Sequence, residues 1–161
     1  MPWVLPGGEL SAEQRALVHR LVTSGDGVEV VVGKAGAGKT SALAAAAAAW
    51  RATGLPVVGT AVAARAALAF GEQAGVPAMT VARLLTALDR PIDGRAPGLA
   101  PGTVLVVDEA GMLGTRPLAR LLTHVQAAGG KLVLVGDHGN CRSSTPAARS
   151  PPSRRPSALS S

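Results

Sequence analysis

The stretch VEVVVGKAGAGKTSALAAAAAAW, residues 28–50, decides the fold. It begins with valines interrupted by one glutamate, a composition that predicts a buried β-strand. It ends with an alanine-rich run, and because alanine has the highest helix propensity, residues 40–53 are predicted to form a helix that stops before Gly54. Low-complexity filler is the alternative interpretation of this run. Between the two lies a glycine-rich turn.

Three further runs share the continuous apolar character of the first strand: LPVVGT at residues 55–60, TVLVVDE at 103–109 and KLVLVGD at 131–137. Runs of this kind are expected for strands that are buried on both faces of a parallel sheet. Helices are predicted between them, at residues 11–23, 61–73, 80–88 and 116–128. This alternation predicts an α/β fold with a mostly parallel sheet of about four strands, and residues 89–102 are predicted to form an irregular loop.

The glycine-rich turn has the sequence GKAGAGKT and fits the pattern G-x-x-x-x-G-K-[ST] of a phosphate loop. Its backbone N–H groups are expected to surround phosphate oxygens, helped by the positive end of the following helix. Lys39 is expected to reach the β- and γ-phosphates, and the Thr40 hydroxyl is expected to bind Mg²⁺. The predicted nucleotide contacts are Gly33, Lys34, Ala35, Gly36, Ala37, Gly38, Lys39, Thr40 and Ser41. A chance match in an ordinary turn is the alternative, and the position between strand and helix argues against it.

Acidic residues end two of the other predicted strands. Asp108 is expected to hold the Mg²⁺ shell, and Glu109 to orient and deprotonate an attacking water. Asp137 is expected to face the γ-phosphate if its strand lies between the acidic pair and the phosphate-loop strand. The alternatives are that the acidic pair caps the next helix and that Asp137 belongs to a surface turn.

Gln14 belongs to the segment LSAEQRALV, residues 10–18, which precedes the first strand. Ser11 and the residues after it form a possible N-cap with an acidic first turn. Alternatively, the Gln14 amide hydrogen-bonds to adenine, because a primary amide matches the donor and acceptor on the adenine edge. The sequence does not choose between these two interpretations.

Composition and charge restrict the possible classes of protein. The chain has 161 residues and one cysteine, Cys141, which excludes an internal disulfide. The N-terminus lacks a secretory signal pattern, and no apolar run reaches membrane-spanning length, so a cytoplasmic protein is expected. The formal charge is +6, and four of these charges are arginines in residues 140–161, which contain no acid. The high pI therefore says little about a nucleic-acid partner.

Together, these motifs resemble the first motor domain of RecD-like superfamily 1 DNA helicases, and most closely the helicase half of TrwC/TraA-type conjugative relaxases. The motifs that carry the resemblance are LSAEQ at residues 10–14, GKAGAGKT at 33–40, TVARLL at 80–85, DEAGM at 108–112 and GDH at 136–138. The segment GTAVAARAAL, residues 59–68, resembles a DNA-facing motif of that family, although the usual Pro-Thr is absent. In TVARLL, Ala82 stands where the family often has histidine. The resemblance implies a RecA-like fold, use of ATP and Mg²⁺, and ATP hydrolysis coupled to translocation on single-stranded DNA in the parent protein.

The resemblance ends near residue 139. The family continues G-D-x-x-Q-L-P, whereas this chain reads Asn140, Cys141, Arg142. We therefore expect a partial motor domain at residues 1–139 and a disordered Ser/Pro/Arg-rich tail at residues 140–161. A one-base shift of the reading frame accounts for the tail, since regrouping suitable codons restores Gln-Leu-Pro in register. A naturally selected disordered tail is the alternative.

Three functions are compatible with these features. The first is an ATP-binding fragment of a helicase that does not unwind DNA by itself. The second is a stand-alone ATPase completed by self-association or by a partner, and the third is a basic DNA-binding module acting through the tail. The resemblance also implies a fifth strand that the partial motor domain lacks, so the phosphate-loop strand is expected at an edge of the sheet, which invites aggregation.

Overall fold

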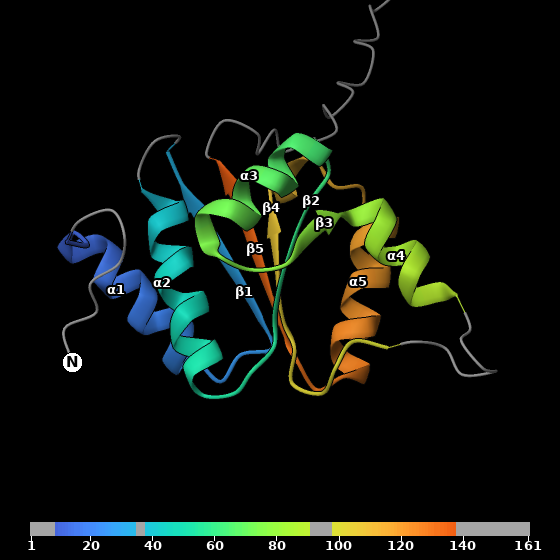
Figure 1. Ribbon diagram of the computed structural model, residues 1–161, viewed down its shortest axis with the longest axis horizontal. Coiled ribbons are helices and arrows are strands. Elements are labelled where there is room, and N and C mark those ends of the chain that lie inside the picture. Colours follow the sequence, from blue (N-terminus) through green and yellow to red (C-terminus); the bar gives the residue numbers. More distant parts are fainter. Residues whose placement is uncertain (1–8, 35–37, 91–97, 138–161) are drawn as a thin grey trace, which may run out of the picture.

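The computed structural model describes residues 9–34, 38–90 and 98–137, in which helices and strands alternate along the chain (Figure 1). The helices are α1 (Ala12–Thr23), α2 (Lys39–Ala52), α3 (Ala64–Ala74), α4 (Val81–Asp89), the 3₁₀ helix η1 (Ala110–Met112) and α5 (Thr115–Ala127). The strands are β1 (Val28–Gly33), β2 (Val57–Ala61), β3 (Ala78–Thr80), β4 (Val104–Asp108) and β5 (Lys131–Asp137). The predictions for Ala35, Gly36 and Ala37, for most of the irregular loop, and for the tail with its proposed frame shift lie outside the described residues.

All strand pairs are parallel, and the strands lie in the order β1-β5-β4-β2-β3. The predicted α/β fold with a parallel sheet is therefore confirmed, and β5 lies between β1 and β4 as expected. The described residues form a sheet of five strands instead of about four. The additional strand is β3, which was not predicted because its three residues form no recognisable apolar run. β1 lies at one edge of the sheet, also as expected.

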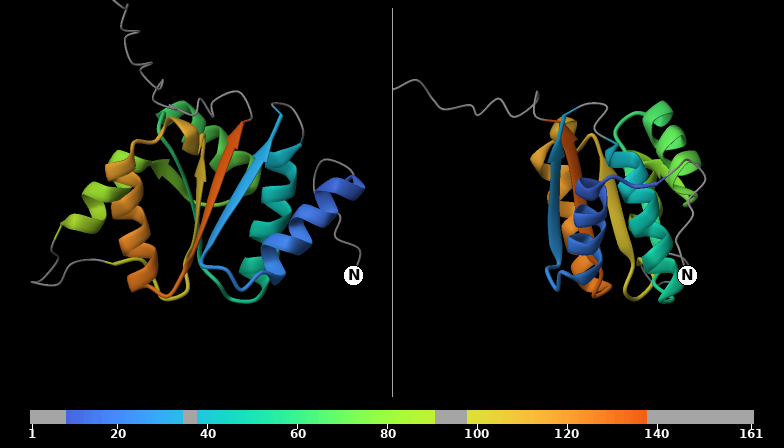
Figure 2. Two further views of the ribbon diagram at one scale, coloured as in Figure 1. Left: turned by 180° about the vertical axis from the view of Figure 1, so that it is seen from behind. Right: turned by 90° about the vertical axis from the view of Figure 1, so that its left-hand side faces the viewer.

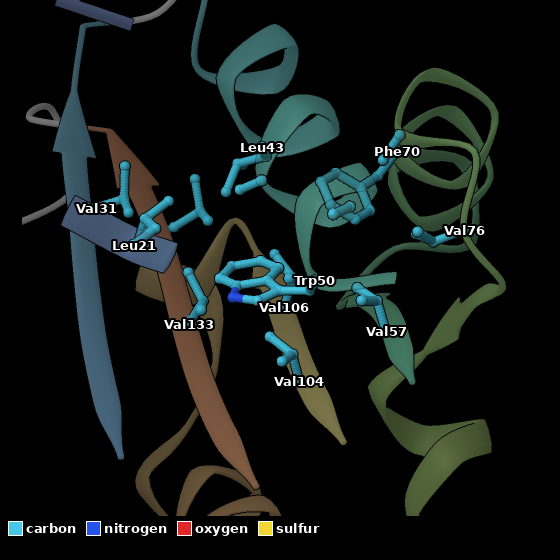
Figure 3. Close-up of a cluster of buried hydrophobic side chains, with 14 residues drawn as sticks. Leu21, Val31, Leu43, Trp50, Val57, Phe70, Val76, Val104, Val106 and Val133 are labelled. Atoms are coloured by element: carbon cyan, nitrogen blue, oxygen red, sulfur yellow. The ribbon is translucent and has the colours of Figure 1, made fainter. Parts of the chain in front are cut away.

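Helices cover both faces of the sheet (Figure 2). On one face, α1, α2 and α3 enclose a core in which the rings of Trp50 and Phe70 lie among valines and leucines (Figure 3). The alanines of α2 are buried there, which lets the helix approach the sheet closely. On the other face, α5 packs against β5 and α4 against β2 and β3, with a second core that includes Leu105, Leu121 and Leu132. None of the helices described is long and apolar enough to span a membrane.

The prediction that all strands are buried on both faces is correct for the centre of the sheet and wrong for β1. In β4, the side chains of residues 104–107 are all buried. In β1, Val31 is buried on the α1–α2 side, but Val28, Val30 and Val32 on the opposite side are exposed. The cause is the edge position, since the second core, as far as the chain is described, contains no residue of β1.

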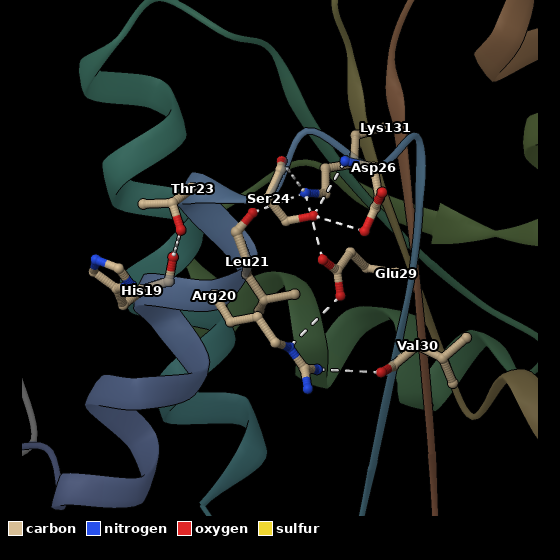
Figure 4. A network of polar contacts seen from close by, with 9 residues as sticks. All are labelled: His19, Arg20, Leu21, Thr23, Ser24, Asp26, Glu29, Val30 and Lys131. Carbon is tan, nitrogen blue, oxygen red and sulfur yellow. Dashed lines mark hydrogen bonds and ion pairs between the residues drawn. The ribbon is translucent and has the colours of Figure 1, made fainter.

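A polar network joins α1 to the sheet at the end opposite the phosphate loop (Figure 4). Lys131 at the start of β5 donates hydrogen bonds to the carbonyl oxygens of Leu21 (2.9 Å) and Ser24 (3.0 Å). The buried carboxylate of Glu29 lies between Arg20 (3.6 Å) and Lys131 (3.9 Å). The network satisfies carbonyl groups at the C-terminal end of α1 that have no partner within the helix.

Candidate functional site

The carboxyl ends of the parallel strands bring the predicted site residues to one edge of the sheet. Gly33 ends β1, Asp108 ends β4 and Asp137 ends β5. α2 begins at the same edge with Lys39, directly after the loop. Because ligands of open parallel sheets bind at this edge, these residues lie where a nucleotide site is expected.

Lys39 and Asp137 contact each other directly. The Lys39 ammonium pairs with a carboxylate oxygen of Asp137, and it also donates to the carbonyl oxygens of Gly33 (2.7 Å) and Gly136 (3.3 Å). The Lys39 side chain is 15% exposed, whereas that of Asp137 is 50% exposed. A mostly buried cation is thus held at the carboxyl ends of β1 and β5, and one of its partners is an accessible anion.

Gly38 connects the loop to α2 and has a left-handed backbone conformation (φ 70°), which favours glycine. Its carbonyl oxygen accepts a hydrogen bond from the Gln14 side-chain amide (3.0 Å). A Cβ atom at residue 38 would collide with this amide. Among the side chains that the structure describes, none caps the N-terminus of α2 at Gly38, and the first-turn residues Thr40 and Ser41 follow it. Free N–H groups at such a terminus favour an anion.

Gln14 takes part in the capping structure that the sequence suggested. Its backbone N–H donates to the Ser11 hydroxyl (3.2 Å), and its side-chain oxygen accepts from the Ser11 N–H (2.7 Å). The side-chain oxygen of Gln14 thus has a partner in the Ser11 N–H, and its side-chain nitrogen has one in the Gly38 carbonyl. One N–H and one oxygen lone pair remain for a nucleotide base, so the adenine interpretation stays a prediction.

Asp108 and Glu109 adopt an unusual local geometry. The Glu109 N–H donates to the Asp108 carboxylate (2.9 Å), and Glu109 has a positive φ of 53°, which is uncommon for a residue with a side chain. Glu109 precedes the 3₁₀ helix η1, but its side chain makes no capping hydrogen bond there. The helix-cap alternative therefore lacks a bond that would support it, and the Glu109 side chain is left exposed.

A pocket of about 400 Å³ adjoins the loop on the side of α1. Its lining residues are Glu13, Gln14, Leu17, Arg20, Val30, Val31, Val32, Gly33, Gly38, Lys39 and Ala42. It thus contains Gln14, Gly33, Gly38 and Lys39, whereas Asp108 and Glu109 do not line it. The Gly136 carbonyl and the contributions of Leu17 and Arg20 were not predicted from the sequence. The spacing of residues 13, 17 and 20 along one helix face was the available signal.

Comparison with known proteins agrees with this geometry. Residues 9–145 match a family model described as an AAA domain. The chain is 39% identical over 128 residues to the probable conjugal transfer protein TraA of Sinorhizobium fredii, an alignment that covers 80% of this chain and 11% of the relative. It is 38% identical over 130 residues to conjugal transfer protein TraA of Agrobacterium fabrum, with 81% of this chain and 11% of the relative covered. The chain therefore spans about a tenth of the length of these relatives, and the expected resemblance to TraA-type proteins is confirmed.

A solved structure shows the same fold. The crystal structure of Pif1 helicase from Candida albicans superposes with a TM-score of 0.55 at 23% identity. The superposition covers 81% of this chain and 33% of the helicase.

Proposed function

The chain belongs to the AAA domain family, and from this membership we propose that it binds Mg-ATP as the first motor domain of a DNA helicase related to TraA-type conjugal transfer proteins. The observation that carries the proposal is the Lys39 ammonium, which belongs to the phosphate-loop sequence and is held at the carboxyl edge of the sheet. The motor domain is proposed to comprise residues 1–139, with residues 140–161 as a separate tail.

The triphosphate is proposed to bind across the loop Gly33–Thr40 and the first turn of α2, including Ser41. Lys39 would bind the β- and γ-phosphates, which requires it to exchange the Asp137 carboxylate for phosphate oxygens. The accessibility of Asp137 supports this exchange, since a half-exposed carboxylate can move into water. Gln14 is proposed to contact the base from α1.

Mg²⁺ is proposed to bind between the Thr40 hydroxyl and Asp108. The described part of the chain contains no group of three or more His, Cys, Asp or Glu side chains that would enclose a metal. This fits Mg²⁺ in nucleotide sites, because that ion typically takes one or two protein ligands together with water and phosphate oxygens. When bound, Mg²⁺ would neutralise charge on the β- and γ-phosphates.

Glu109 is proposed to orient the attacking water and to accept its proton. Its side chain is exposed and makes no capping hydrogen bond to η1, which supports this role. In the parent protein, hydrolysis would be coupled to translocation along single-stranded DNA. The resemblance of residues 59–68 and 80–85 to DNA-facing motifs supports this part of the proposal.

Replacement of Lys39 by alanine tests the nucleotide site. A charge-assisted contact is worth about 1.5–3 kcal/mol, so Lys39→Ala is expected to weaken binding of a fluorescent ATP analogue by about ten- to a hundredfold. Titration by fluorescence anisotropy in the presence of Mg²⁺ measures the affinity.

Arg90→Ala is the matched control, since it removes one exposed positive charge at the C-terminal end of α4. It is expected to bind the analogue like the wild type. Circular dichroism establishes that all three proteins fold. Equal affinity of folded wild-type protein and Lys39→Ala would contradict the proposed site.

A further inference from the structure

Within residues 9–34, 38–90 and 98–137, no strand pairs with the outer edge of β1. Leu132 of β5 donates its N–H to the Gly27 carbonyl (2.8 Å), which fixes the alternation of hydrogen bonds along the strand. Residues 27, 29, 31 and 33 therefore bond toward β5, whereas Val28, Val30 and Val32 direct their N–H and C=O groups away from the sheet. Among the described residues, one side chain covers these groups, since Arg20 donates to the Val30 carbonyl at 3.3 Å.

The side chains along this edge are apolar and accessible. Val28, Val30 and Val32 are 42%, 55% and 46% exposed, and all three lie on the face opposite α1. Natural edge strands are usually protected by charges, proline or shortness. The other edge strand, β3, has only three residues, so the sheet formed by the described strands has one long edge that is open to pairing.

The sequence of this edge complements itself. Val30 is the centre of the segment from Asp26 to Lys34, in which Val28 and Val32 stand at equal distances on either side. Asp26 precedes the strand by two residues and Lys34 follows its end, and both are exposed. The segment thus has opposite charges at equal distances from its central valine.

We propose that two copies of this chain associate through antiparallel pairing of their β1 strands about a two-fold axis at Val30. In that register Val28 faces the partner's Val32 and Asp26 faces the partner's Lys34, and each pair occurs twice. The outward N–H and C=O groups of the two strands meet, and two five-stranded sheets become one continuous sheet. Because β3 is too short to pair in the same way, assembly stops at the dimer.

The surroundings of the strand leave room for this pairing. The pocket of about 400 Å³ beside Val30, Val31 and Val32 lies between α1 and the strand edge, and its lining also includes Gln14, Gly33 and Lys39 of the candidate nucleotide site. Arg20 has to release the Val30 carbonyl, but it keeps its ion pair with Glu29. The two phosphate-loop edges point in opposite directions in such a dimer, and the Asp26 of one copy lies beside Lys34 in the proposed triphosphate loop of the other.

Sedimentation velocity of the full chain over a range of concentrations tests the proposal. The wild type is expected to form dimers, and Val30→Lys is expected to stay monomeric because it places two like charges against each other on the axis. Leu68→Lys is the matched control, since Leu68 is 63% exposed but lies on α3. It is expected to dimerise like the wild type. A monomeric wild type, or dimers that survive Val30→Lys, would overturn the proposal.

Charge reversal tests the register. Asp26→Lys and Lys34→Asp each create two like-charged pairs, and each variant alone is expected to dimerise about tenfold more weakly. An equimolar mixture of the two variants restores both opposite-charge pairs and is expected to form mixed dimers with wild-type affinity. A mixture that associates no better than its components would rule out this register. Circular dichroism spectra that match the wild type are required of every variant.

Discussion

At the scale of single residues, the Thr60 hydroxyl stands out because it is a buried polar group without a hydrogen-bond partner among the described residues. Thr60 is fully buried in β2, and its hydroxyl has no hydrogen-bond partner within the described part of the chain. Thr60→Val keeps the shape and removes the unsatisfied group, so it is expected to raise the free energy of unfolding by about 1 kcal/mol. Urea denaturation measures the change.

Thr103 provides the comparison for this prediction. It is equally buried, but its hydroxyl donates to the Ala100 carbonyl at 2.6 Å. Thr103→Val is therefore expected to lower the free energy of unfolding by about 1–2 kcal/mol. If both substitutions shift stability in the same direction, the difference in hydrogen bonding is not what determines their effect.

At the scale of elements, the attachment of α1 depends on Lys131. Its side chain is 13% exposed, and it holds the last carbonyl groups of α1 and lies beside Glu29. Lys131→Met keeps the apolar stem but leaves the Glu29 carboxylate with Arg20 as its remaining cation. The free energy of unfolding is expected to fall by about 2–3 kcal/mol, as measured by urea denaturation.

Glu29→Gln is the control for Lys131→Met. It removes the charge of Glu29 but preserves the two bonds from Lys131 to α1, so a smaller loss of stability is expected. A loss from Glu29→Gln that equals or exceeds the loss from Lys131→Met would show that the carboxylate, and not the carbonyl bonds, fastens α1.

Most helices and strands could be predicted from the sequence, but their exposure could not. The strands and the helices between them follow from local apolar pattern and glycine positions, so α1, α2 and α5 lie close to their predicted ranges. α3 begins at Ala64 instead of residue 61, because β2 continues through Ala61. The run at residues 28–32 has the composition of a central strand, and composition does not reveal whether a helix covers each of its faces. Its glutamate was the one local signal, and its partners, Arg20 and Lys131, are far away in sequence.

The candidate site was predictable to a similar extent. The phosphate-loop pattern and the strand-end acids identify Lys39, Asp108 and Asp137, and parallel pairing then brings them to one edge. The direct pairing of Lys39 with Asp137 and the bond from Gln14 to Gly38 depend on distances between separate elements. No local pattern contains that information.

At the scale of the whole molecule, the chain is expected to bind ATP but to hydrolyse it very slowly. The proposed function assigns Glu109 to the water but assigns none of the arginines of the chain to the γ-phosphate. Such arginines are worth about 10³–10⁵ in rate in related phosphoryl transfers, so the 161-residue chain is expected to hydrolyse ATP at less than about 10⁻² per second. Phosphate release, measured with and without single-stranded DNA, determines the rate, and Glu109→Gln provides the background. Fast or DNA-stimulated release by the monomer would contradict this expectation.

Because Trp50 is buried, its fluorescence reports whether the protein is folded. Tryptophan emission shifts to longer wavelength when the indole ring moves from an apolar interior into water, and the chain contains two tryptophans and no tyrosine. Trp50 is 3% exposed and extends from the last turns of α2, the helix that begins at the phosphate loop, into the core between that helix and the sheet. With Trp3 replaced by phenylalanine, the emission of the chain comes from a single ring in this core. The emission wavelength then reports whether the core between α2 and the sheet is folded, without any added dye.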